Sequence, residues 1–217
     1  MCTLKTKKIL AEDVKAIQVP ELFRKNDIPY FDVCQVNWPK EFPYCPKMQA
    51  AIAFTDSAIL VHYKVQEQSV RAVAQKDHDA VWEDSCAEFF SSPAEDGLYY
   101  NVECNCAGKL LIAVGPDRNQ RTPAPKEVME AVDRWASLGT EPFDTKEGTT
   151  EWEIALVIPF TTYFKHHIES LEGKTLRANF YKCGDKLPVP HFVSWNRIDK
   201  PSPDFHCPEF FGEVTVE

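Results

Sequence analysis

Short segments in which apolar and polar residues alternate most strongly constrain the fold of this chain. The clearest is 99–106. One of its stripes consists of Tyr100, Val102, Cys104 and Cys106, and the other of Tyr99, Asn101, Glu103 and Asn105. A period of two is the period of a β-strand with one buried face. Gly108 predicts a turn, and the largely apolar segment KLLIAVG at 109–115 predicts the returning strand of a hairpin.

The same alternation recurs at 59–65, 152–158 and 176–181, and residues 210–217 are typical of a closing strand. One helix is predicted at 126–139, where Val128, Ala131, Val132 and Trp135 follow helical spacing between Pro125 and Gly139. A smaller helix is expected near 12–17. Sixteen prolines against eight glycines favour long, irregular connections. We therefore predict an all-β protein, an antiparallel β-sandwich with one short helical insertion. Residues 1–217 form one domain, with 1–35 as an N-terminal extension packed on it.

The charge balance excludes one class of partner. Net charge is −9, from 24 basic and 33 acidic residues, and no basic cluster is present, which argues against nucleic acid. Apolar runs such as 154–160 are too short to span a membrane. No secretory signal is visible, because the N-terminal lysines precede no apolar segment. As written, the chain is expected in the cytoplasm; a chain from which a signal had been removed would be periplasmic or secreted.

The eight cysteines are interpreted as reduced thiols, since the chain is neither small nor visibly exported. Cys104 and Cys106 could form a disulfide or contribute to a zinc site. No second paired-cysteine unit completes a tetrahedral site, and the pair lies on an apolar stripe. Core packing is therefore the favoured interpretation, since a free cysteine behaves as a small buried hydrophobe.

Residues 82–90 suggest a binding surface. If they form an extended strand, Trp82, Asp84, Cys86 and Glu88 point one way, while Ala87 and Phe89 point into the core. The neighbouring strand adds Asn101, Glu103 and Asn105 to the polar face. An aromatic ring packs on the C–H face of a pyranose, and carboxylates and amides bond its hydroxyls. This combination favours a sugar ligand.

Several segments carry a resemblance to a known family: WEDSCAEFF at 82–90, YYNVECNCAG at 99–108, EWEIALVIPF at 151–160, LRANFYKCGD at 176–185 and HFVSWNRIDKPSPDFHCPEFFGEV at 191–214. Together they resemble carbohydrate-binding module family 9, especially its stand-alone members from gut Bacteroidetes, from about residue 36 to the end. The resemblance implies a jelly-roll-type β-sandwich that binds short saccharides or polysaccharide chain ends without cleaving them. It also implies structural calcium, with no ligands assignable by motif.

The resemblance further implies which residues bind. Trp82 and Trp195 would stack on either side of a sugar unit, and Glu88 and Asn105 would bond its hydroxyls. Glu103 stands where well-described members carry a basic residue, so the pattern of hydroxyl bonds is expected to differ here. A functional association with glycoside hydrolases in polysaccharide degradation is expected. Since no catalytic module is attached, the family's usual tethering of an enzyme to polysaccharide is not expected to apply directly.

Further site candidates and alternative functions are compatible with the sequence. Asn179 and Tyr181 share one face of their strand and are candidates to extend the site. Trp82 and Trp195 could instead be core residues, and Asn105 a turn cap before Gly108. A glycoside hydrolase would use Glu88 with Glu103 or Asp84, about 5–10 Å apart. Haem binding would need Met48 or Met129, which show no recognisable ligand pairing. Non-catalytic sugar binding is favoured, because the acids surround an aromatic plate.

Overall fold

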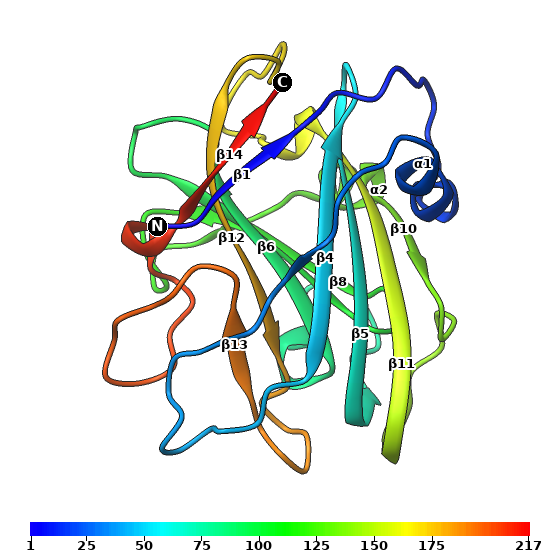
Figure 1. The fold of residues 1–217 in the computed structure, drawn as a ribbon, viewed down its shortest axis with the longest axis vertical. Coiled ribbons are helices and arrows are strands. Elements are labelled where there is room, and N and C mark those ends of the chain that lie inside the picture. The colour runs from blue at the N-terminus through cyan, green and yellow to red at the C-terminus, as the bar shows by residue number, and fades with distance from the viewer.

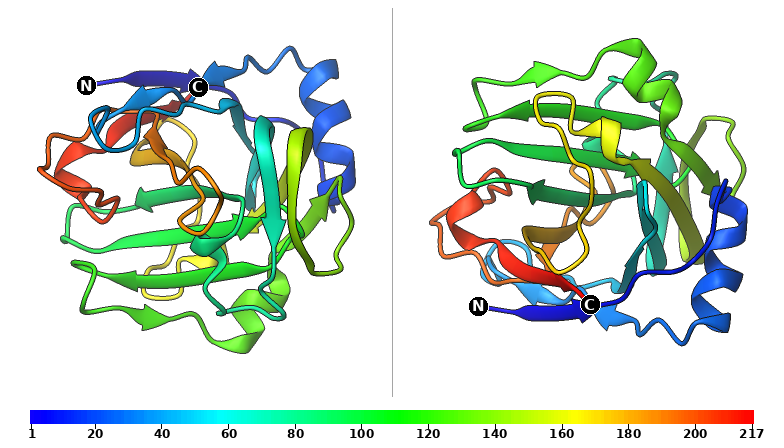
Figure 2. Two further views of the ribbon diagram at one scale, coloured as in Figure 1. Left: turned by 90° about the horizontal axis from the view of Figure 1, so that it is seen from below. Right: turned by 90° about the horizontal axis from the view of Figure 1, so that it is seen from above.

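A computed structural model describes residues 1–217 and shows two packed β-sheets (Figures 1 and 2). The first has nine strands, in the spatial order β1 (Thr3–Thr6), β14 (Gly212–Val216), β12 (Thr175–Cys183), β6 (Cys86–Ser92), β7 (Tyr99–Asn105), β8 (Leu110–Gly115) and β9 (Thr122–Pro123), with β13 (Phe192–Ser194) beside β12 and β3 (Gln35–Val36) beside β13. The second has five, in the order β10 (Asp133–Ala136), β11 (Phe143–Pro159), β5 (Ala58–Ala72), β4 (Lys47–Phe54) and β2 (Phe31–Asp32). All strand pairs are antiparallel except β1 with β14. The predicted β-sandwich is confirmed.

Helical segments are few and short: α1 (Val19–Lys25), α2 (Lys126–Ala131) and four 3-10 turns at Ala16–Gln18, Val81–Glu83, Phe160–Thr162 and Pro208–Phe210. None of them reaches the length and apolarity that a membrane-crossing helix requires. Helix α1 covers the outer face of the five-stranded sheet, where Val19 and Phe23 pack on Leu60 and Val157 (Figure 1).

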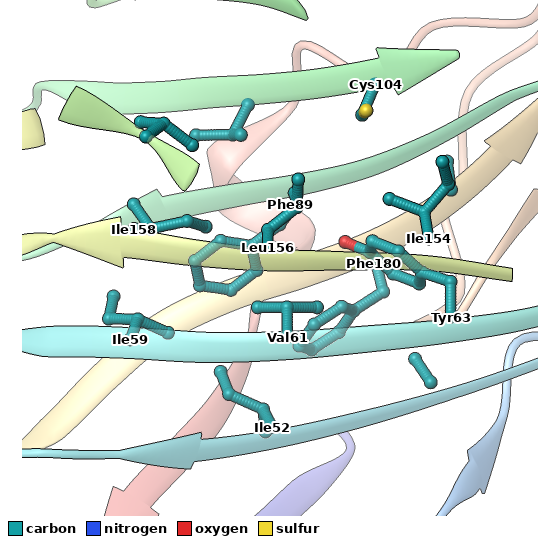
Figure 3. Close-up of a cluster of buried hydrophobic side chains, with 14 of the residues drawn as sticks. Ile52, Ile59, Val61, Tyr63, Phe89, Cys104, Ile154, Leu156, Ile158 and Phe180 are labelled. Carbon is teal, nitrogen blue, oxygen red and sulfur yellow. The ribbon is translucent and has the colours of Figure 1, made fainter. Parts of the chain in front are cut away.

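The core lies between the sheets and follows the alternation in the sequence. Ile59, Val61 and Tyr63 of β5 point inward and meet Phe89 of β6 and Phe180 of β12 (Figure 3). Cys104 and Cys106 belong to this same core, as predicted. All eight cysteines are free thiols.

Two predicted elements differ from the structure. The helix predicted over 126–139 is wrong beyond Ala131, because Val132 turns the backbone to an extended conformation and β10 then pairs with β11. Val128 and Val132 are buried in the observed conformation, and β10 provides hydrogen-bond partners for the backbone groups at the edge of β11. The strand predicted from Trp82 is also wrong in its first part, because Val81–Glu83 form a 3-10 turn and β6 begins at Cys86.

The N-terminal extension supplies strands to both layers. β1 adds to the edge of the nine-stranded sheet beside β14, and β2 pairs with β4 in the other sheet. Ala16–Gln18 and α1 form slightly after the small helix expected near 12–17. Residues 1–35 are thus part of the sandwich framework.

Candidate functional site

A pocket of about 860 Å³ lies over the outer face of the nine-stranded sheet. Its floor consists of Glu88 and Phe90 from β6, Asn101 and Glu103 from β7, Leu111 and Ala113 from β8, and Cys183 at the end of β12. Strand parity places them there: Ala87 and Phe89 point into the core, so Glu88 and Phe90 point outward. The walls are formed by the 3-10 turn at Trp82, by Pro123 of β9 and Phe192 of β13, and by loop residues. The loop residues are His78, Arg118, Arg121, Ala124, Asp185, Pro203, Asp204, Phe205 and His206.

Trp82 is the one tryptophan among the exposed large hydrophobic residues, with 38% of its surface accessible. Its backbone is fixed, since its carbonyl accepts a hydrogen bond from the Asp185 amide at 3.2 Å. The adjacent Asp84 is fully buried, and its carboxylate accepts the amide hydrogens of Val73 and Ala74 at 3.0 and 3.1 Å. The turn is therefore anchored from both sides, while the indole ring stays open to the pocket.

Glu88 and Glu103 form a carboxyl pair at the floor. They stand directly opposite each other on β6 and β7 and are only 2% and 4% exposed. The Cys183 thiol donates to Glu88 Oε1 at 3.0 Å, and Asn101 Nδ2 donates to Glu103 Oε1 at 2.9 Å, while Glu103 Oε2 has no partner.

The environment of this pair favours protonation. Burial, followed by the charge of Glu103, raises the pKa of Glu88 well above its ordinary value. Burial raises the pKa of Glu103 to about 7. Two carboxylates this close cannot both ionise easily, so the pair retains a proton at neutral pH. It can then both donate and accept hydrogen bonds.

Two arginines lie at the β8 side of the pocket. Arg121 donates to the carbonyls of Tyr99, Ala113 and Gly115 at 3.0–3.2 Å and to the Asn101 side chain. Its guanidinium also lies 4.2 Å from the centre of the Tyr99 ring. Arg121 thus orients Asn101, which in turn donates to Glu103. Arg118 pairs with Asp204 at 2.9 Å on the more exposed rim.

The remaining wall is aromatic. Phe205 stacks flat on Tyr181, with 4.2 Å between ring centres, and the Tyr181 hydroxyl donates to the Phe205 carbonyl at 3.2 Å. Phe90 packs against His206. Burial, with the positive charges of Arg121 and Arg118, lowers the pKa of His206 to about 4, so its ring is neutral. On the other side, burial and the charge of Glu83 raise the pKa of Asp185 to about 6.

Of the seven residues predicted to bind ligand, the structure brings Trp82, Glu88 and Glu103 together at the pocket. Asn105, Trp195, Asn179 and Tyr181 do not line it. Trp195 is 8% exposed and lies in the core, with its ring 5.5 Å from Phe31 and 5.8 Å from Phe180. The expected pair of stacking tryptophans is therefore not formed. Phe90, Phe192 and Phe205 are the other aromatic rings at the pocket.

The three polar candidates outside the pocket have internal hydrogen-bond partners. Asn105 Oδ1 accepts the amides of Ala107 and Lys109 at 3.1 and 2.9 Å, which is the turn-capping alternative. Asn179 Oδ1 accepts the Asn196 amide at 2.8 Å, and its Nδ2 donates to the Asn196 carbonyl. Tyr181 lies beneath Phe205 and supports the wall without facing the pocket.

The structure also bears on the alternative hypotheses of a hydrolase and of haem binding. Asp84 is fully buried and engaged by backbone amides, so it cannot reach a substrate as the partner of Glu88. Met48 and Met129 both lie in the core. Arg118 and Arg121 were not predicted, because loops carry no periodic pattern, and Phe192 was not predicted, because β13 is only three residues long. The one available signal was that Phe192 and 203–206 fall within the last family-like segment.

The side chains of this structure do not identify ligands for the expected structural calcium. The one group of three converging His, Cys, Asp or Glu residues is Cys86, Glu88 and Cys183. Calcium takes oxygen ligands, and two of these three donors are sulfur.

Comparison with known proteins agrees with this architecture. A family model described as carbohydrate-binding family 9 matches residues 17–216. No curated protein matches the chain. A crystal structure from Bacteroides uniformis, of a protein to which carbohydrate binding is provisionally ascribed, is 49% identical, has a TM-score of 0.97 and is covered over 99% of both chains.

Two structures of a family 9 carbohydrate-binding module from Caldicellulosiruptor kristjanssonii share the fold. The cellotriose complex has a TM-score of 0.60 at 9% identity and is covered over 100% of this chain and 94% of that one. The glucose complex has a TM-score of 0.54 at 10% identity, with 100% and 96% covered.

Proposed function

The chain belongs to carbohydrate-binding family 9, and from this premise we propose that it binds a mono- or oligosaccharide, or a polysaccharide chain end, without cleaving it. The binding site is the pocket over the outer face of the nine-stranded sheet. One observation carries the proposal: an accessible indole, Trp82, borders the same pocket as the buried carboxyl pair Glu88 and Glu103.

The chemistry of this arrangement suits a sugar. The Trp82 ring offers a flat apolar surface to the C–H face of a pyranose. The pair formed by Glu88 and Glu103 holds at least one proton at neutral pH, so it can donate to one hydroxyl and accept from another. Affinity is expected to be modest, because sugar hydroxyls are well hydrated and an open pocket buries limited area.

A second candidate is a glycoside hydrolase that uses the same two carboxyls. Residues directly opposite across antiparallel strands have Cβ atoms about 4.5–5.5 Å apart, close to the carboxyl separation of about 5–5.5 Å in retaining enzymes. The raised pKa of both acids would suit a general acid. However, both side chains rise from one sheet face, so they would approach a sugar from the same side. Hydrolysis needs carboxyls that flank the scissile bond.

A glycan array followed by incubation with the recognised saccharide separates these functions. Binding without release of reducing ends is the expected result. Absence of binding to every glycan on a broad array would contradict the proposal. Release of reducing ends, lost in Glu88→Gln and Glu103→Gln, would instead establish the hydrolase.

Two wider expectations belong to this proposal. The first is a role beside a glycoside hydrolase in polysaccharide degradation, which predicts that the protein speeds such an enzyme on an insoluble substrate more than on a soluble one. The second is structural calcium, which predicts a lower melting temperature after treatment with EGTA. If the hydrolase is not faster on the insoluble substrate, the first expectation is wrong. If EGTA leaves the melting temperature unchanged, the second is wrong.

A further inference from the structure

Two cysteines that are far apart in the sequence meet beneath the pocket. Cys86 of β6 stands directly opposite Cys183 of β12, and Glu88 lies two residues from Cys86 on the same face. All three are buried. The two sulfurs and a Glu88 oxygen lie within 4.8 Å of one another, and the contact between Cys183 Sγ and Glu88 Oε1 is 3.0 Å.

This spacing matches a tetrahedral metal site. Zinc bonds of about 2.3 Å to sulfur and about 2.0–2.2 Å to carboxylate oxygen place two sulfurs and one oxygen about 3.5–3.8 Å apart in a tetrahedral site. The three donors need only small side-chain movements to reach that geometry. Two sulfurs and one oxygen also suit zinc better than calcium or magnesium, which take oxygen ligands.

The acids of the floor have no directly paired cation. No Lys, Arg or His forms an ion pair with Glu88 or Glu103. Glu103 stands opposite Glu88, and its Oε2 is buried without any hydrogen-bond partner. Arg121 directs its terminal nitrogens to three backbone carbonyls and Asn101. Ionising a buried acid without a paired cation is costly, which is why this pair holds a proton; a bound divalent cation would supply the missing charge and allow Glu88 to ionise.

We propose that Cys86, Cys183 and Glu88 bind one zinc ion at the floor of the pocket. Glu88 and Cys183 line the pocket, so the ion can enter from it, and the fourth coordination position is open to the pocket for water or a ligand hydroxyl. Binding converts both thiols to thiolates and requires Glu88 as a carboxylate, so the two thiol protons leave to solvent and the proton shared by the carboxyl pair stays on Glu103 or leaves with them. The zinc site itself does not depend on the proposed sugar binding; only the ligation of a sugar hydroxyl does.

Titration of the reduced, full-length protein with cobalt(II) chloride tests the site. Tetrahedral thiolate ligation gives thiolate-to-cobalt charge-transfer bands and strong d–d bands, which are expected to saturate at one equivalent and to disappear when zinc chloride is added. Losing even an outer-shell partner of a metal ligand weakens affinity about 10- to 100-fold, so Cys86→Ser and Cys183→Ser are each expected to weaken cobalt binding by more than about 100-fold.

The matched control replaces the two exposed cysteines, Cys34 and Cys45, with serine, which should leave the titration unchanged. Absence of the bands in reduced wild-type protein would overturn the proposal. So would bands that survive both Cys86→Ser and Cys183→Ser, or a Cys86–Cys183 disulfide that resists dithiothreitol. If a serine variant does not fold, Glu88→Gln keeps both thiols and should still weaken binding by at least about tenfold; an unchanged affinity would count against the site. These titrations contain no sugar, so their outcome is distinct from that of the glycan array.

Discussion

Replacement of Trp82 by alanine tests the proposed sugar contact most simply. An aromatic side chain buries up to roughly 250 Å², and 38% of Trp82 is accessible in the free protein, so about 95 Å² is available to a ligand. At about 25 cal/mol per Å², full coverage is worth about 2.4 kcal/mol and coverage of one ring face about 1.2 kcal/mol. Since about 1.4 kcal/mol corresponds to a tenfold change, Trp82→Ala should weaken binding about 7- to 50-fold.

Isothermal titration calorimetry with a saccharide chosen from the array measures this change. Trp82→Phe should keep part of the affinity, because a smaller ring still covers the sugar face. Trp135→Ala is the matched control: this tryptophan lines a separate pocket over the five-stranded sheet, and its loss should leave affinity unchanged. Equal affinity of wild type and Trp82→Ala would refute the reasoning, provided that circular dichroism shows both folded.

Three further predictions concern stability. Lys182 is fully buried and its Nζ lies 3.0 Å from Glu67 Oε2, so Lys182→Met should lower the free energy of unfolding by about 3–5 kcal/mol in urea denaturation; a loss below about 1 kcal/mol would contradict this ion-pair assignment. Trp195→Ala should cost about 3–5 kcal/mol because the ring fills the core, and a stable variant with weakened sugar binding would restore the stacking role. The unfolded chain protonates His206 near about pH 6.5, whereas the folded chain does so near pH 4, so its stabilising contribution is full above about pH 6.5 and falls towards pH 4. At pH 5 this loss amounts to about 2 kcal/mol, and denaturation of wild type and His206→Gln at pH 7 and pH 5 should show it as a steeper fall in wild type; parallel falls would refute it.

The sequence predicted the sandwich well because strand alternation directly encodes which face is buried. Cys104, Phe89 and Val61 all face the core as their parity indicates. Glu88 and Glu103 reach the pocket floor for the same reason. Parity is a local property, so it transfers from sequence to structure wherever a strand is continuous.

The prediction failed where local pattern does not determine the environment. Trp195 has polar neighbours, but Ser194 and Asn196 are themselves buried, and the Ser194 hydroxyl donates to the Asn196 carbonyl at 2.7 Å. Polar flanks therefore did not signal exposure. The meeting of Cys86 with Cys183 depends on which strands become neighbours, and spacing along the chain carries no information about that pairing.

The central claim is that the pocket over β6, β7 and β8 binds a saccharide. A crystal structure of the protein with the saccharide that binds best on the array tests it most directly. We predict a sugar ring in van der Waals contact with Trp82, with hydroxyls bonded to Glu88 or Glu103. A sugar bound elsewhere, such as beside Trp135 over the five-stranded sheet, would contradict the account.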